Sequence, residues 1–62
     1  MIFSVAIEIK PGQLWQNPRE TVFEVLEVTL DYVELREEES LKKTFRLNPL
    51  DLIRRFTQVE TY

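Results

Sequence analysis

The side chains that most enzymes use for nucleophilic chemistry are missing from this 62-residue chain. It contains no cysteine and no histidine, which excludes a thiol nucleophile, a histidine base and an ordinary zinc site. Ser4 and Ser40 stand in no recognisable catalytic motif. With Gly12 as the only glycine, a glycine-rich phosphate-binding loop is excluded too. The sequence therefore predicts a protein that is not an enzyme.

Three consecutive acids, Glu37, Glu38 and Glu39, are the remaining candidates for acid/base or metal chemistry. Paired carboxylates catalyse only where a cleft separates their pKa values, whereas consecutive acids repel one another and resist burial. The run also lacks the spacing of a calcium-binding loop. We expect an exposed hairpin tip, with no catalytic residue, no metal and no cofactor.

The charges are unevenly distributed along the chain, whose net charge is −3. Residues 40–62 hold five of the eight basic residues, and these are Lys42, Lys43, Arg46, Arg54 and Arg55. A basic strand at 41–47 and a basic helix end at 54–55 could bind the phosphates of a nucleic acid. The acidic excess of the whole chain would repel that backbone, so nucleic-acid binding is the weaker hypothesis beside an ordinary solvated surface of mixed sign.

Two aromatic residues could serve either a binding surface or the interior. Trp15, the only tryptophan, would contribute strongly to a small core if its ring were buried. Tyr32 is the better candidate for an exposed binding residue, because Val33 and Leu35 occupy the inward phase of the same run. Both aromatics, together with the five basic residues, are candidate partner-binding residues.

Apolar and polar residues alternate through most of the chain, as in half-buried strands. Phe3, Val5 and Ile7 share one phase near the N-terminus, and the segment 41–47 places Leu41, Phe45 and Leu47 on its inner phase. In 21–29 both phases carry apolar residues, which predicts a strongly bent strand with a bulge. Turns are expected at 10–12, 17–20, 30–31 and 37–40.

A short helix is predicted at about residues 49–56, before the last strand at 57–62. Asn48 is suited to cap it and Pro49 to occupy its first position. Arg54 and Arg55 fit its last turn, where cations favour the helix dipole. So short a helix must dock on the rest of the protein.

These elements predict an all-β fold: a small antiparallel barrel of five or six strands, in one domain spanning 1–62, with residues 1–9 as an additional strand. The spacing of Gly12, Trp15, Phe23 and Phe45 and the late helical turn resembles a small SH3-like barrel. It is similar to short barrels found among bacterial and phage proteins. The resemblance implies binding of peptides, RNA, DNA or proteins in place of catalysis.

The favoured function is a protein-binding module that occupies a larger protein, as a phage or bacterial accessory or inhibitor protein would. The N-terminal strand, through Phe3, Val5 and Ile7, could pair with its counterpart in a second copy and form a homodimer. The start of the chain lacks the pattern of a signal peptide, and no run is long enough for a membrane span. We expect a cytoplasmic protein without membrane contacts.

Overall fold

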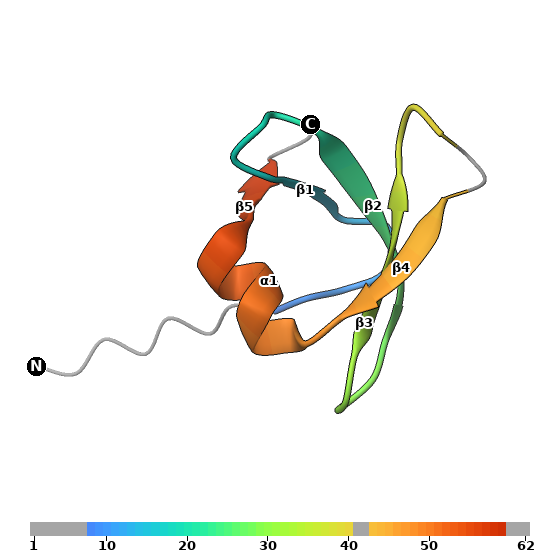
Figure 1. Ribbon diagram of the computed structural model, residues 1–62. Coiled ribbons are helices and arrows are strands. Elements are labelled where there is room, and N and C mark those ends of the chain that lie inside the picture. The colour runs from blue at the N-terminus through green and yellow to red at the C-terminus, as the bar shows by residue number, and fades with distance from the viewer. Residues whose placement is uncertain (1–7, 41–42, 60–62) are drawn as a thin grey trace, which may run out of the picture.

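Five short strands and one helix make up the part of the chain that the structure, a computed structural model, describes, namely residues 8–40 and 43–59 (Figure 1). The strands are β1 (Leu14–Gln16), β2 (Val22–Val28), β3 (Val33–Glu37), β4 (Thr44–Leu47) and β5 (Thr57–Val59). The helix α1 (Pro49–Arg55) connects β4 to β5.

All strands belong to one antiparallel sheet in the order β4-β3-β2-β1-β5. This confirms a small all-β fold with one short helix before the last strand. In the described part of the chain the sheet is not closed, since β4 pairs only with β3 and β5 only with β1. Among the described strands, β4 and β5 therefore form the open edges of the sheet.

Tight turns lie on both sides of β1, as their residue types predict. Gly12 has φ 92°, a conformation that glycine adopts without a Cβ clash, and the Gln13 N–H donates to the Lys10 carbonyl at 3.2 Å. After β1, Asn17 Oδ1 accepts hydrogen bonds from the backbone of the following turn, including the Thr21 N–H at 2.9 Å. These local bonds fix where β1 begins and ends.

The bulge predicted in 21–29 is confirmed by a break in the pairing of β2 with β3. The register shifts between Val25 and Glu27, so Leu26 is an extra residue on β2 and the strand bends there. Phe23 and Val25 are buried before the shift, and Val28 packs against the core after it. One strand thus presents apolar residues of both phases to the interior.

The core is formed by one cluster of side chains, to which β1, β2, β3 and α1 each contribute buried residues. Its buried members are Trp15, Phe23, Val25, Val33, Leu35 and Leu52. Figure 1 shows the strands curving around one interior, with α1 lying along one side. Leu52, the buried residue of α1, attaches the helix to this cluster.

The helix begins as predicted and ends one residue earlier. Asn48 Oδ1 accepts from the Leu50 N–H at 2.9 Å, and Pro49 follows as the first helical residue. Phe56, expected in the helix, is extended and forms the C-terminal cap instead. Its ring lies 5.5 Å from that of Phe23, so the chain turns into β5 while keeping the aromatic in contact with the core.

Two expectations about buried strands need correction. Phe45 faces Leu35 in the register and shares its inward phase, yet Phe45 is 38% exposed because none of the described strands covers the outer edge of β4. The predicted strand 1–9 does not extend to Glu8 and Ile9, which are irregular, although Ile9 packs against the core. Phe3, Val5, Ile7, Leu41 and residues 60–62 lie outside the described residues.

Candidate functional site

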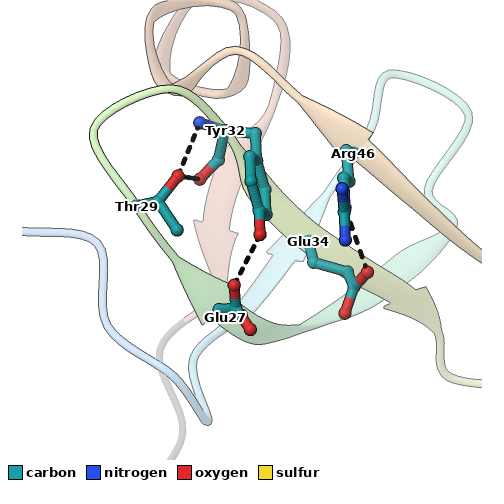
Figure 2. Close-up of polar contacts among 5 residues, drawn as sticks. All are labelled: Glu27, Thr29, Tyr32, Glu34 and Arg46. Atoms are coloured by element: carbon teal, nitrogen blue, oxygen red, sulfur yellow. Dashed lines mark hydrogen bonds and ion pairs between the residues drawn. The ribbon is translucent and has the colours of Figure 1, made fainter.

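The turn between β2 and β3 positions Tyr32 immediately before β3. The Thr29 hydroxyl accepts from the Tyr32 N–H at 3.0 Å and lies 3.2 Å from the Tyr32 carbonyl, to which it can donate. The Thr29 N–H also donates to that carbonyl at 2.9 Å. Because Thr29 bonds both the N–H and the carbonyl of Tyr32, the backbone from which the Tyr32 ring projects is fixed (Figure 2).

The hydroxyl of Tyr32 is held by a carboxylate on the neighbouring strand. It donates to Glu27 Oε1 at 2.6 Å, a short charge-assisted bond. This hydrogen bond is the main reason that the pKa of Tyr32 is raised above the usual tyrosine value, and the negative charges of Glu27 and Glu34 add to it while Arg46 opposes it. The phenol therefore stays protonated and donating throughout the neutral range.

Arg46 lies over the ring of Tyr32 and brings β4 into the site. Its guanidinium carbon is 4.3 Å from the ring centroid, within the range of a cation–π contact. Its Nε also donates to Glu34 Oε1 at 3.4 Å, which follows from the register that places Glu34 opposite Arg46. Figure 2 shows the ring and the guanidinium side by side, each with its own glutamate. We call Glu27, Tyr32, Glu34 and Arg46 the Tyr32 cluster.

The face of the sheet that carries the Tyr32 cluster offers charged and aromatic groups that can contact another molecule. A second salt bridge joins β2 to β3, between Arg36 Nη2 and Glu24 Oε1 at 2.7 Å. The two salt bridges and the tyrosine bond occupy the carboxylates of Glu24, Glu27 and Glu34. Within residues 8–40 and 43–59, no group of three or more acidic side chains is placed to hold a metal ion.

Of the residues singled out from the sequence, the structure brings together Tyr32 and Arg46. Glu27 and Glu34 were not singled out, and their part in the site depends on the pairing register of β2 with β3 and of β3 with β4. Alternating residues alone do not reveal that register. The one feature of the sequence that relates these residues is alternation, which places Tyr32 and Glu34 on the same, outward side of their segment.

Trp15 occupies the interior, in line with the structural interpretation of this residue. Its side chain is 3% exposed, and its Nε1–H donates to Gln13 Oε1 at 3.1 Å. A partner would therefore meet this tryptophan only if the core opened, which corrects its place among the surface-binding candidates.

Those of the predicted basic residues that the structure describes are divided between the β4 region and the end of α1. Lys43 is exposed just before β4, and Arg54 and Arg55 are exposed in the last turn of α1. In Figure 1 the start of β4 and the end of α1 lie on opposite sides of the molecule. Lys42 lies outside the described residues, and Arg46 belongs to the Tyr32 cluster.

The open edge of β4 runs beside this cluster. The Glu37 N–H donates to the Lys43 carbonyl at 3.3 Å, and hydrogen-bonded pairs alternate along an antiparallel ladder. The backbone groups of Phe45 therefore face β3, whereas those of Thr44 and Arg46 point outward. This edge combines two outward-facing residues with the partly uncovered ring of Phe45, which contacts the Phe23 ring edge-on at 5.3 Å.

No protein-family model, curated protein or solved structure matches this chain. None of the helices in the described part is long and apolar enough to cross a membrane.

Proposed function

We propose that the protein is a non-catalytic protein-binding domain that accepts an extended segment of a partner along the open edge of β4. The observation that carries the proposal is the combination at this edge of outward backbone groups at Thr44 and Arg46 with the 38% exposed ring of Phe45. Strand addition of this kind takes affinity from backbone hydrogen bonds and specificity from alternate side chains. Phe45 supplies an apolar contact on one phase.

The Tyr32 cluster supplies polar contacts on the other phase. Tyrosine and arginine are the residues most often found at the energetic centres of protein interfaces. Here Glu27 and Glu34 already hold Tyr32 and Arg46 in position. These two side chains therefore lose little conformational entropy when a partner contacts them. A segment lying along β4 would have this pair on its outward side.

The edge of β5 is the weaker acceptor. It pairs with β1 through Leu14↔Val59 and Gln16↔Thr57. In an antiparallel ladder, backbone groups that bond the neighbouring strand alternate with groups that point away from it. Along β5, the backbone groups of Thr57 and Val59 therefore face β1, and those of Gln58 point outward. None of the three β5 side chains is a large exposed apolar group. The β4 edge thus offers both more backbone groups and an apolar anchor.

An SH3-like small barrel is part of this proposal. The bend of β2 between Val25 and Glu27 and the burial of Leu52 from the helix before the last strand support a sheet that curls around its core. In such a barrel β4 would be an edge at which closure is incomplete. Nuclear Overhauser contacts in solution between β4 and the strand at the other end of the sheet, β5, test this closure.

Affinity capture with matched edge variants tests the binding function. In Thr44→Pro the proline removes an N–H that points away from β3, a position that an edge strand tolerates. In Gln58→Pro the same change is made on the β5 edge. We expect wild type and Gln58→Pro to retain the same partner and Thr44→Pro to lose it, with Arg46→Ala reducing recovery.

Each variant is first checked for cooperative unfolding by the fluorescence of Trp15. Equal recovery by folded Thr44→Pro and by wild type would contradict the β4 edge as the binding surface. Recovery of nucleic acid, lost in Arg54→Glu/Arg55→Glu, would favour the other hypothesis from the sequence.

A further inference from the structure

We infer that the segment accepted by β4 is residues 2–7 of a second copy of this chain, so that two copies exchange their N-terminal segments. The inference rests on the proposed function, because it names the partner of the same edge. It differs from self-pairing of two N-terminal segments, since each segment here adds to β4 of the other copy.

The side-chain pattern of residues 2–7 matches what the β4 edge lacks. Phe3, Val5 and Ile7 share one phase, and in an added strand they would lie on the core side beside Phe45. Burying the 38% exposed Phe45 ring against aliphatic side chains removes apolar surface from water. The incoming strand therefore completes the row of inward residues that ends at β4.

The opposite phase of the segment suits the Tyr32 cluster. This phase consists of Ile2, Ser4 and Ala6. With the short side chains of Ser4 and Ala6 next to Arg46, the guanidinium would keep its place on the Tyr32 ring. Residues 2–7 also contain no charged side chain. No unpaired charge would be buried at the new interface.

The described chain begins at a fixed point close to β1. The Glu8 carbonyl accepts from Gln13 Nε2 at 2.8 Å, and Ile9 packs against the core. Residues 1–7 precede this anchored point, and a fully extended segment of that length spans roughly 23 Å at about 3.3 Å per residue. Four of these residues, spanning about 13 Å, would match the length of β4.

The sheet order favours a second copy over the same copy as donor. β1 is separated from β4 by β2 and β3, a path of about 14 Å at the usual strand spacing. The direct route through the interior is filled by the core, where Leu35 and Leu52 are fully buried. A segment serving its own β4 would use most of its length in crossing, whereas a second copy can approach the edge from outside.

Each copy carries one donor segment and one acceptor edge, so reciprocal exchange closes into a symmetric dimer. Light scattering over a dilution series should give a mass near twice the 7.5 kDa of one chain. Val5→Asp in the donor, which would bury a charge against Phe45, and Thr44→Pro in the acceptor should each weaken dimerisation at least tenfold. Gln58→Pro should leave it unchanged.

Mixing the two impaired variants gives the sharpest result. Val5→Asp keeps an intact acceptor and Thr44→Pro keeps an intact donor, so an equimolar mixture should form a heterodimer through one restored exchange. If Thr44→Pro does not unfold cooperatively, hydrogen exchange of the wild type replaces it: the amides of Thr44 and Arg46 should be protected at high concentration and lose protection on dilution.

A wild-type mass of one chain throughout the series would overturn the exchange, and protected Thr44 and Arg46 amides in that monomer would identify its own segment as the occupant. A dimer that survives Thr44→Pro would overturn it equally. If the wild type is monomeric but captures another protein through a Thr44-dependent contact, the proposed function stands and the exchange fails. If neither dimer nor capture is observed, both fail.

Discussion

The guanidinium carbon of Arg46 lies 4.3 Å from the centre of the Tyr32 ring. Glu27 holds the hydroxyl of Tyr32, and Glu34 holds Arg46. Exposed contacts of these types contribute little to the stability of a fold. Their larger consequence is that the long Arg46 side chain and the Tyr32 ring are held in one arrangement beside an outer strand of the sheet.

Tyr32 should ionise at higher pH than an ordinary tyrosine, since its pKa is raised mainly by the hydrogen bond to Glu27. Glu27→Gln removes the carboxylate and should lower the pKa of Tyr32 toward the usual value of about 10. Absorbance of the phenolate during an alkaline titration measures the change. Tyr32→Phe identifies which transition belongs to Tyr32, because Tyr62 is the second tyrosine.

The same bond links stability to pH with a definite sign. A folded-state pKa above that of the unfolded chain means that the stabilisation is fully present below about pH 10 and is lost as pH rises through the folded pKa. The wild type should therefore lose more unfolding free energy than Tyr32→Phe above pH 10. Equal losses in the two proteins would contradict a Tyr32–Glu27 bond in solution.

Leu52 and Leu50 form a matched pair for testing how α1 is held. Leu52 is fully buried, whereas Leu50 is 62% exposed. Leu52→Ala should reduce the free energy of unfolding by about 2–5 kcal/mol through lost burial and a residual cavity. Leu50→Ala should change it by about 0.5 kcal/mol or less. Urea unfolding followed by Trp15 fluorescence measures both, and similar effects would mean that α1 docks through another face.

Gly12 should be needed for its backbone conformation and not for lack of space. Its φ is 92°, and a Cβ built there would have nothing within 4 Å. Gly12→Ala should therefore destabilise the protein by about 1–2 kcal/mol through backbone strain alone. Gly12→Asn should cost less, since asparagine tolerates positive φ better. Urea unfolding with no loss in Gly12→Ala would show that the turn adopts another conformation.

The parts of the fold that depend on neighbouring residues were predictable from the sequence. The turn at Gly12 and the cap at Asn48 each need only a few adjacent side chains and a backbone preference. The inward phase of Val33 and Leu35 follows from alternation within a single strand. These features are set locally, so a local pattern is sufficient to predict them.

The candidate site was only half predictable because it depends on register. A shift of one residue moves every side chain to the other face of a strand, and β2 contains such a shift between Val25 and Glu27. Alternation within β2 and β3 does not say which glutamate meets Tyr32. The exposure of Phe45 likewise depends on the position of β4 at the edge, which one strand's pattern does not reveal.

The cap of α1 is the last feature whose contribution can be isolated. Asn48 Oδ1 accepts from the Leu50 N–H at 2.9 Å, and this helix of seven residues has few bonds of its own. Asn48→Ala removes the acceptor and should lower the free energy of unfolding by about 1 kcal/mol, whereas Asn48→Asp keeps it and should have little effect.

Urea unfolding of the three proteins measures the difference, and exchange of the Leu50 amide locates it. If Asn48→Asp lost as much stability as Asn48→Ala, the amide group of Asn48 would be needed for another contact and its capping role would be wrong. Loss confined to Asn48→Ala, with faster exchange at Leu50, would instead assign the stability to the cap. Because α1 follows β4 directly, the same variant should also loosen the end of the strand whose open edge we propose as the binding surface.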